Sequence, residues 1–167
     1  MVDFERHLRR DNLRRALLQC GLAGIVVVIL LLVLDAVTQT VLIAAIGSSA
    51  FVAFVMPRSM QSSPRHLVGG YVVGVASGCV MSLLNSAIGV SGGAIGHAVM
   101  IIFGALAISL AMLLMVVTRT EHSPAAALAL GLVINEWSLL TIVVILGGIV
   151  GLSLMKRLVL PMLLDLV

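Results

Sequence analysis

Apolar residues occur along this chain in long blocks. Four blocks are long enough to span a bilayer as helices, because each is near or above the ~20 residues that a crossing requires. They cover roughly residues 16–34, 67–88, 95–117 and 138–160. The pattern predicts an all-α protein whose main helices lie in lipid.

Two shorter apolar segments, residues 41–56 and 123–134, lie between the long ones, and both are marked by Gly or Pro. As helices they reach about 24 Å and 18 Å, at ~1.5 Å per residue. The hydrocarbon core of a bilayer is ~30 Å thick. The chain therefore runs long–short–long twice, which predicts a polytopic transmembrane bundle of four long and two short or broken helices.

Similar residues recur at matching places in the two halves. Thr38-Gln39-Thr40 precedes the first short segment, and Thr118-Arg119-Thr120 precedes the second. Glycine pairs follow at 69–70 and 147–148, so the offset is about 80 residues in both cases. We predict a duplication within one transmembrane domain, residues 16–167. Repeat one covers about 16–88 and repeat two about 95–160, and the basic segment 1–15 precedes both.

Basic residues indicate how the short segments run. Five of the ten lie before residue 16 and are typical of a cytoplasmic anchor. If both short segments cross, all ten basic residues fall on one side. If both re-enter, Arg58, Arg65 and Arg119 face the other side. The positive-inside rule favours six crossings with both termini in the cytoplasm. The repeats are then inverted, three helices each, and Trp137 lies at the outer interface.

Composition excludes a soluble fold. The chain is 61% hydrophobic and 10% charged, with a net charge of +3, and its mean hydropathy is +1.24. Soluble domains carry about 25% charged residues. We expect the lipid bilayer as a partner and no nucleic acid, because no soluble domain accompanies the arginines. The 16 glycines suit close helix packing and are compatible with a homo-oligomer.

Three stretches carry a family resemblance. TRTEHSPAAALAL, residues 118–130, resembles the signature TRT-x-HPPAGATAL of the HPP family of integral membrane proteins. VLIAAIGSSAFVAF, residues 41–54, resembles the family segment around PPFGASAVLLF. SSPRHLVGGYVVG, residues 62–74, resembles its QPRNVVGGH stretch. The three occur in family order and cover about 40 to 130.

The resemblance implies anion transport, because plant members are associated with nitrite transport in plastids. For this chain it implies a protein of the bacterial inner membrane. The sequence departs from the family pattern at Ser123, where a proline is usual, at Ala126 and Leu128, and at the pair Ala44-Ala45. These departures bear on the substrate and not on the fold.

The second short segment begins with His122-Ser123-Pro124. Proline suits the first turn of a helix and serine can cap it. A helix start offers unpaired N–H groups and a positive dipole end, which bind an anion without formal charge. These residues are therefore either a plain cap at the inner interface or part of a substrate site. His122 could also act as a titratable switch.

The first short segment carries Gly47, Ser48 and Ser49 at its middle. Glycine allows close approach, and serine hydroxyls can donate to an ion or bond back to their own helix. We predict a substrate site between segments 44–50 and 122–128. Arg119 and Thr120 are assigned to an inner vestibule, where Arg119 either attracts anions or only sets topology.

These residues favour a channel or carrier for a small anion such as nitrite or nitrate. We expect no enzyme activity, catalytic residue, cofactor or metal. Proton coupling has no evident carrier, because no acidic residue lies at mid-membrane. One alternative is a non-transporting scaffold or subunit partner that docks through a lipid-facing glycine stripe at 69–78 or 147–151. Another is an intramembrane hydrolase, with Ser91 in a GxSG match as its nucleophile.

Overall fold

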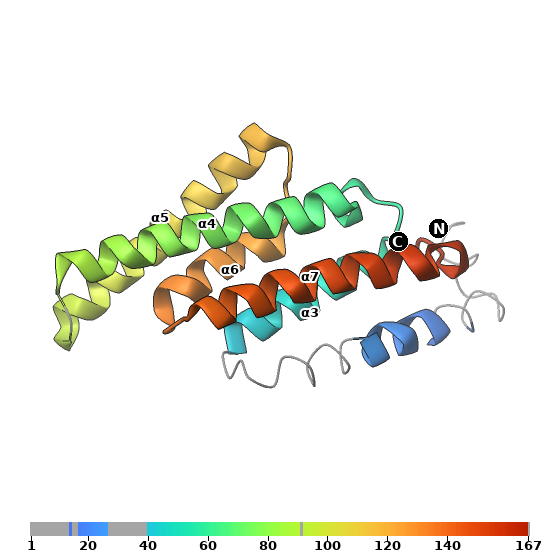
Figure 1. The fold of residues 1–167 in the computed structure, drawn as a ribbon, viewed down its shortest axis with the longest axis horizontal. Helices are drawn as coiled ribbons and strands as arrows, with labels where there is room; N and C mark the ends of the chain where they lie inside the picture. Colours follow the sequence, from blue (N-terminus) through green and yellow to red (C-terminus); the bar gives the residue numbers. More distant parts are fainter. Residues whose placement is uncertain (1–13, 15–16, 27–39, 91, 167) are drawn as a thin grey trace, which may run out of the picture.

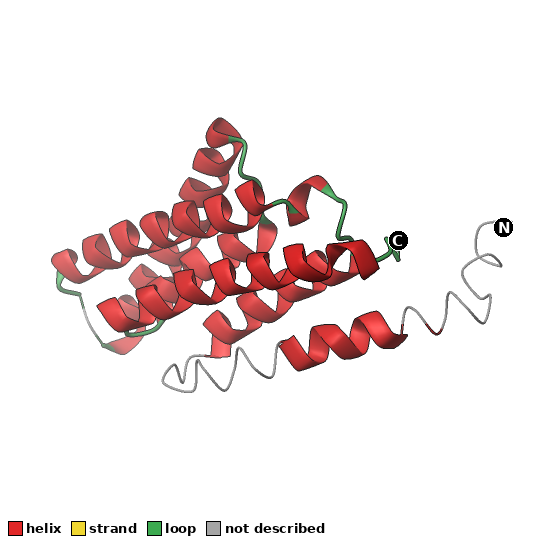
Figure 2. Cartoon of the chain, turned by 45° about the vertical axis from the view of Figure 1, so that its right-hand side comes forward, coloured by secondary structure: helices red, strands yellow, loops and turns green. Residues whose placement is uncertain are grey.

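The computed structural model describes residue 14 and residues 17–26, 40–90 and 92–166. The elements in these ranges are a helix Leu17–Val26, α3 (Thr40–Val55), η1 (Met60–Ser62), α4 (Pro64–Ile88), α5 (Gly93–Thr118), α6 (Ser123–Ile134), α7 (Leu139–Val159) and η2 (Leu160–Met162). Figures 1 and 2 show these helices side by side in one bundle. The described part of the chain has no strand, so the prediction of an all-α bundle is confirmed.

Most of the predicted segments correspond to helices. α4, α5 and α7 match three of the long segments, and α3 and α6 match the two short ones. The predicted first span, residues 16–34, lies partly outside the described residues, which show a helix only for Leu17–Val26. The long and short segments were thus predictable from hydropathy alone.

Local sequence explains where the helices begin and end. α4 starts with Pro64 in its first turn and ends at Gly89, whose φ of 69° is the left-handed conformation that glycine adopts easily. α7 begins with a capping box in which Ser138 and Thr141 bond to each other's backbone. α5 ends at Arg119, where the backbone N–H of Thr120 donates to the carbonyl of Met115 at 2.9 Å.

The short helix α6 occupies the middle of the bundle, as Figure 1 shows. It packs against α3, α4 and α5. Eight of its twelve residues are buried, namely Pro124, Ala125, Ala126, Leu128, Ala129, Gly131, Leu132 and Val133. Because neighbouring helices enclose α6 on most sides, α6 does not need to be as long as the membrane is thick.

A row of glycines brings α4 very close to α6. A Cβ atom on Gly78 would lie 2.8 Å from the carbonyl oxygen of Ala129, and one on Gly74 would overlap the carbonyl of Ala125. A Cβ on Gly70 would lie 2.7 Å from the Cβ of His122. Small residues allow this backbone approach in membrane helices. The glycines of the stretch 69–78 therefore face α6 and the connection before it, so the lipid-facing stripe that the scaffold alternative expected there was wrong.

The described basic residues from Arg58 onward gather at one end of the bundle. The guanidinium of Arg65 donates to the carbonyl of Thr118 at 2.9 Å, and Lys156 Nζ donates to Ser62 Oγ at 2.8 Å. These bonds place the end of α5, the start of α4 and the end of α7 together. We call this the basic end; it comprises residues 56–65, 118–121 and 156–166.

The opposite end comprises residues 89–90, 92 and 135–138. Trp137 Nε1 donates there to Ser82 Oγ, near the end of α4, at 2.9 Å. α6 therefore starts on the side of the basic end and finishes at the opposite end, from which α7 returns. The short helix runs across the bundle and does not fold back on itself.

The outer faces of the long helices are strongly apolar. Three helical segments are long and apolar enough to cross a membrane, namely Pro64–Ile88, Gly93–Thr118 and Leu139–Met162. Leu139 and Leu158 expose 75% of their surface, and Val117 exposes 72%. Contiguous apolar surface on this scale is tolerated only in lipid or at an interface. Lipid contact is therefore built into the fold.

Candidate functional site

A buried polar cluster lies at the start of α6. Ser49 of α3, Tyr71 of α4 and His122 meet here, and each is at most 1% exposed. Ser49 Oγ lies 2.8 Å from the Tyr71 hydroxyl and 2.8 Å from His122 Nε2. The structure thus brings together the two short segments on which the predicted site was placed. Their role in binding stays a prediction.

The cluster is recessed into the bundle. Tyr71 lies seven residues after the start of α4 at Pro64, and Ser49 lies six residues before the end of α3 at Val55. At ~1.5 Å per residue, His122 therefore lies about 10 Å inside the basic end. Because α6 starts at this depth, twelve residues are enough for it to reach the opposite end.

Hydrogen-bond accounting constrains the protonation of this cluster. Ser49 Oγ donates to the carbonyl of Ala45 at 3.0 Å. A hydroxyl has only one proton, so when it goes to Ala45, Tyr71 and His122 Nε2 both donate to Ser49. In this tautomer the neutral ring of His122 is left with Nδ1 as an acceptor, whereas in the other tautomer Ser49 donates to Nε2 and Nδ1 carries the proton. Nδ1 is buried, and no hydrogen-bond partner for it exists in the described residues.

A cavity of about 250 Å³ adjoins His122. Gln61, Glu121, His122, Ser123 and Ala126 line it, together with Met112, Met115 and Val116 of α5. The N-cap residue of α6 is His122, and no side chain caps the helix. The expected cap by Ser123 was therefore wrong, because Ser123 is itself the first helical residue. In the first turn Pro124 has no N–H, and the N–H of Ala125 donates to the carbonyl of His122 at 3.0 Å. The N–H of Ser123 therefore remains without a partner in the described residues.

A second histidine lies beside Glu121, one of the residues that line this cavity. His66 Nδ1 bonds to Ser63 Oγ at 2.8 Å, and His66 Nε2 lies 3.4 Å from the carboxylate of Glu121. The Glu121 side chain is 42% exposed, whereas that of His66 is 9% exposed. Glu121 therefore stands between the solvent at the basic end and the cavity beside His122.

The remaining predicted site residues have other surroundings. Gly47 lines a separate apolar cavity of about 360 Å³ beside Cys20 and Phe51. Ser48 is exposed on α3, and Pro124 is buried in the first turn of α6. Of the predicted segment 44–50, Ser49 is thus the residue that the structure brings to His122.

The two predicted vestibule residues differ from each other. Arg119 is exposed at the basic end. Thr120 is buried, its Oγ1 lies 2.8 Å from Thr118 Oγ1, and it packs against Gly69 and Gly70. Arg119 is therefore placed where an ion could meet it, whereas Thr120 holds the connection against α4.

A polar cavity of about 560 Å³ lies at the other end of α6. Its polar lining comes from α4 and from the connection to α7, and consists of Ser82, Asn85, Ser86, Asn135, Glu136 and Trp137. The short helix thus separates two cavities. Between them, the glycine contacts of α4 with α6 close the bundle.

Sequence reasoning missed Tyr71 and Gln61. Tyr71 is the only tyrosine in the chain and lies in a glycine-rich stretch of a span. A buried phenol usually finds a hydrogen-bond partner, and this could have indicated a polar cluster. Gln61 had no comparable signal, because only the fold of the 57–63 connection brings it to His122. Ser91, the nucleophile of the hydrolase alternative, lies outside the described residues.

The fold and its recessed polar cluster define a polytopic helical membrane protein. The model of the family described as HPP, transmembrane region, matches residues 9–160. The chain therefore belongs to the HPP family. No curated protein and no solved structure matches it significantly.

Proposed function

We propose that this protein passes a small anion such as nitrite or nitrate across a bacterial inner membrane. The observation that carries the proposal is the uncapped start of α6, which lies about 10 Å inside the bundle beside a cavity. The unpaired N–H of Ser123 and the positive end of the helix dipole favour an anion there. Neutral donors avoid the cost of burying a formal charge in the membrane.

The route runs along the seam between α4 and α6. An ion that enters from the basic end reaches the cavity at His122, and the polar cavity at Trp137 leads out at the opposite end. Gly74 and Gly78 close the seam between the two. Passage therefore requires α4 and α6 to separate, and glycines let the helices move with little side-chain rearrangement.

The order of helices also supports an inverted repeat. Short α3 and short α6 stand at matching places, and each is followed by a long helix, α4 or α7. Transporters built from inverted repeats place their sites where interrupted helices meet. In this arrangement the basic end faces the cytoplasm, and so do both termini.

Flux of nitrite and nitrate into proteoliposomes tests the proposal. Ser49→Ala removes the hydroxyl that joins α3 to His122 and should lower protein-dependent flux by about tenfold, because its two contacts, with Tyr71 and with His122, are lost. Ser48→Ala, a neighbour on the exposed side of α3, should stay within about twofold of the wild type. Equal flux in both variants would remove this cluster from the route.

The scaffold alternative retains one observation in its favour. Gly147 of α7 is exposed, and a Cβ atom added there would meet nothing within 4 Å. A partner helix could pack closely at this point. This alternative predicts no flux in proteoliposomes, together with cross-linking of a residue-147 cysteine to another subunit.

A further inference from the structure

We propose that His122 binds a proton together with the anion, so that the two cross as a neutral pair. The inference rests on the proposed function and names the coupling ion. It starts from His122 Nδ1, a buried ring nitrogen without a hydrogen-bond partner in the described residues. In the tautomer in which Nε2 donates to Ser49 and Ser49 donates to Ala45, Nδ1 has a free lone pair. A free lone pair next to a cavity is a place for a proton.

The surroundings of Nδ1 suit the protonated ring. The backbone carbonyl of Gln61 lies near the ring, where it can accept a hydrogen bond from a protonated Nδ1. In the tautomer that carries its proton on Nε2, the neutral Nδ1 has no proton to donate, so in that tautomer this bond forms only after protonation. The bond of Nε2 to Ser49 is kept in both states, because Nε2 donates in each. Protonation therefore adds one interaction and breaks none.

Charge explains why the proton and the anion enter together. A lone imidazolium in this buried place would be costly, and so would a lone anion. An anion at the uncapped turn of α6 offsets the charge of the ring, and the ring offsets that of the anion. By linkage each raises the affinity for the other by the same factor. The pair carries no net charge through the seam between α4 and α6.

The groups around His122 supply one path for the proton. Glu121 lines the cavity and contacts His66, and its side chain is 42% exposed at the basic end. Arg65 is held at the carbonyl of Thr118 and Arg119 is exposed, so both remain at the surface. The other neighbours do not titrate near neutral pH; they are Ser49, Gln61, Tyr71, Met112 and Met115. Glu121 is thus the group that can carry a proton from solvent to the cavity.

Proton uptake on anion binding tests the pairing without any variant. Nitrate is added to the purified full-length protein in weakly buffered detergent, and bound anion and released or absorbed protons are measured together. We expect about one proton absorbed per nitrate bound, as linkage requires. Nitrate that binds without proton uptake overturns the pairing and leaves the anion site standing. If no nitrate or nitrite binds at all, the proposed function fails as well.

Transport provides the second test. Nitrate is the probe because, as the anion of a strong acid, it does not cross lipid as the neutral acid. A pH gradient that is acid outside should drive nitrate into wild-type proteoliposomes with the membrane potential clamped. His122→Gln keeps an N–H donor for Ser49 but cannot bind the proton, and should reduce gradient-driven uptake by about tenfold. His97→Gln, on an exposed histidine of α5, is the matched control and should stay within about twofold. Full gradient-driven uptake by His122→Gln would overturn the pairing.

Discussion

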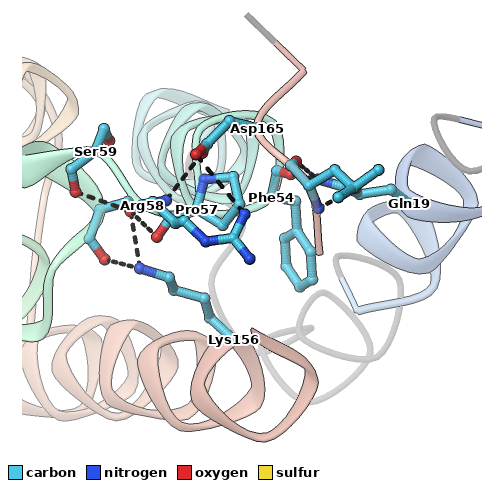
Figure 3. Close-up of polar contacts among 9 residues, drawn as sticks. Gln19, Phe54, Pro57, Arg58, Ser59, Lys156 and Asp165 are labelled. Carbon is cyan, nitrogen blue, oxygen red and sulfur yellow. Dashed lines mark hydrogen bonds and ion pairs between the residues drawn. The ribbon is translucent and has the colours of Figure 1, made fainter. Parts of the chain in front are cut away.

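At the scale of single residues, Lys156 shows how the basic end is held together. Its Nζ donates to the carbonyl and the hydroxyl of Ser62, and only 5% of the residue is exposed. Figure 3 shows the Lys156 side chain reaching from α7 to the connection that contains Arg58 and Ser59. Arg58 lies beside Asp165. Ser62 in turn bonds to the carbonyl of Pro57 at 2.8 Å. A charge that looks like a topology signal in sequence thus also fastens α7 to the start of α4.

Removing this charge should weaken the bundle. Lys156→Met keeps the aliphatic volume but leaves the Ser62 carbonyl without its donor, at a cost of about 1–3 kcal/mol. The melting temperature in detergent should fall clearly. Arg157→Met changes the exposed neighbour and should have little effect. If both variants melt at the same temperature, the Lys156 contacts add no net stability.

At the scale of elements, the seam between α4 and α6 depends on glycine. Gly74→Ala would push a methyl group into the carbonyl of Ala125 and should cost about 1–3 kcal/mol through overpacking. Gly147→Ala has open space around it and should be neutral or stabilising by up to about 1 kcal/mol. Folded yield and melting temperature distinguish the two. A tolerated Gly74→Ala would contradict the close approach of the helices.

Contacts between elements also join the helix Leu17–Val26 to the C-terminal segment. Gln19, in the helix Leu17–Val26, bonds to the carbonyl of Phe54 and exchanges two hydrogen bonds with the backbone of Leu164, at 2.7 Å and 3.1 Å. Figure 3 places Gln19 beside Phe54 near the C-terminal segment. The backbone N–H of Leu166 donates to the carbonyl of Val55 at 2.9 Å. The C-terminal segment therefore pins the first described helix to α3.

At the scale of the whole molecule, the two ends of the bundle should face opposite sides of the membrane. In a background without Cys20 and Cys79, Glu136→Cys should react with an impermeant maleimide from outside intact cells. Arg157→Cys should react only in inverted vesicles, because the positive-inside rule places the basic end in the cytoplasm. Labelling of both from one side would contradict the crossing of α7.

Hydropathy and charge determined much of this architecture. The runs of apolar residues specify α3 to α7, because burying a helix in lipid depends mainly on length and composition. The single-sided basic residues predicted that both short segments cross the membrane, and in the structure α6 runs from one end of the bundle toward the other. The segment TRTEHSPAAALAL carried the resemblance to the family to which the chain belongs.

The tertiary structure alone decided which polar groups meet. Nothing in the sequence separates Ser49 from Ser48, because one residue of helical rotation sends one side chain inward and its neighbour outward. Gly70, Gly74 and Gly78 read as a stripe that could face lipid or protein, and only the position of α6 selects protein. Tyr71, Gln61 and the free nitrogen of His122 come together from distant parts of the chain. Such contacts depend on how helices pack, which local pattern does not encode.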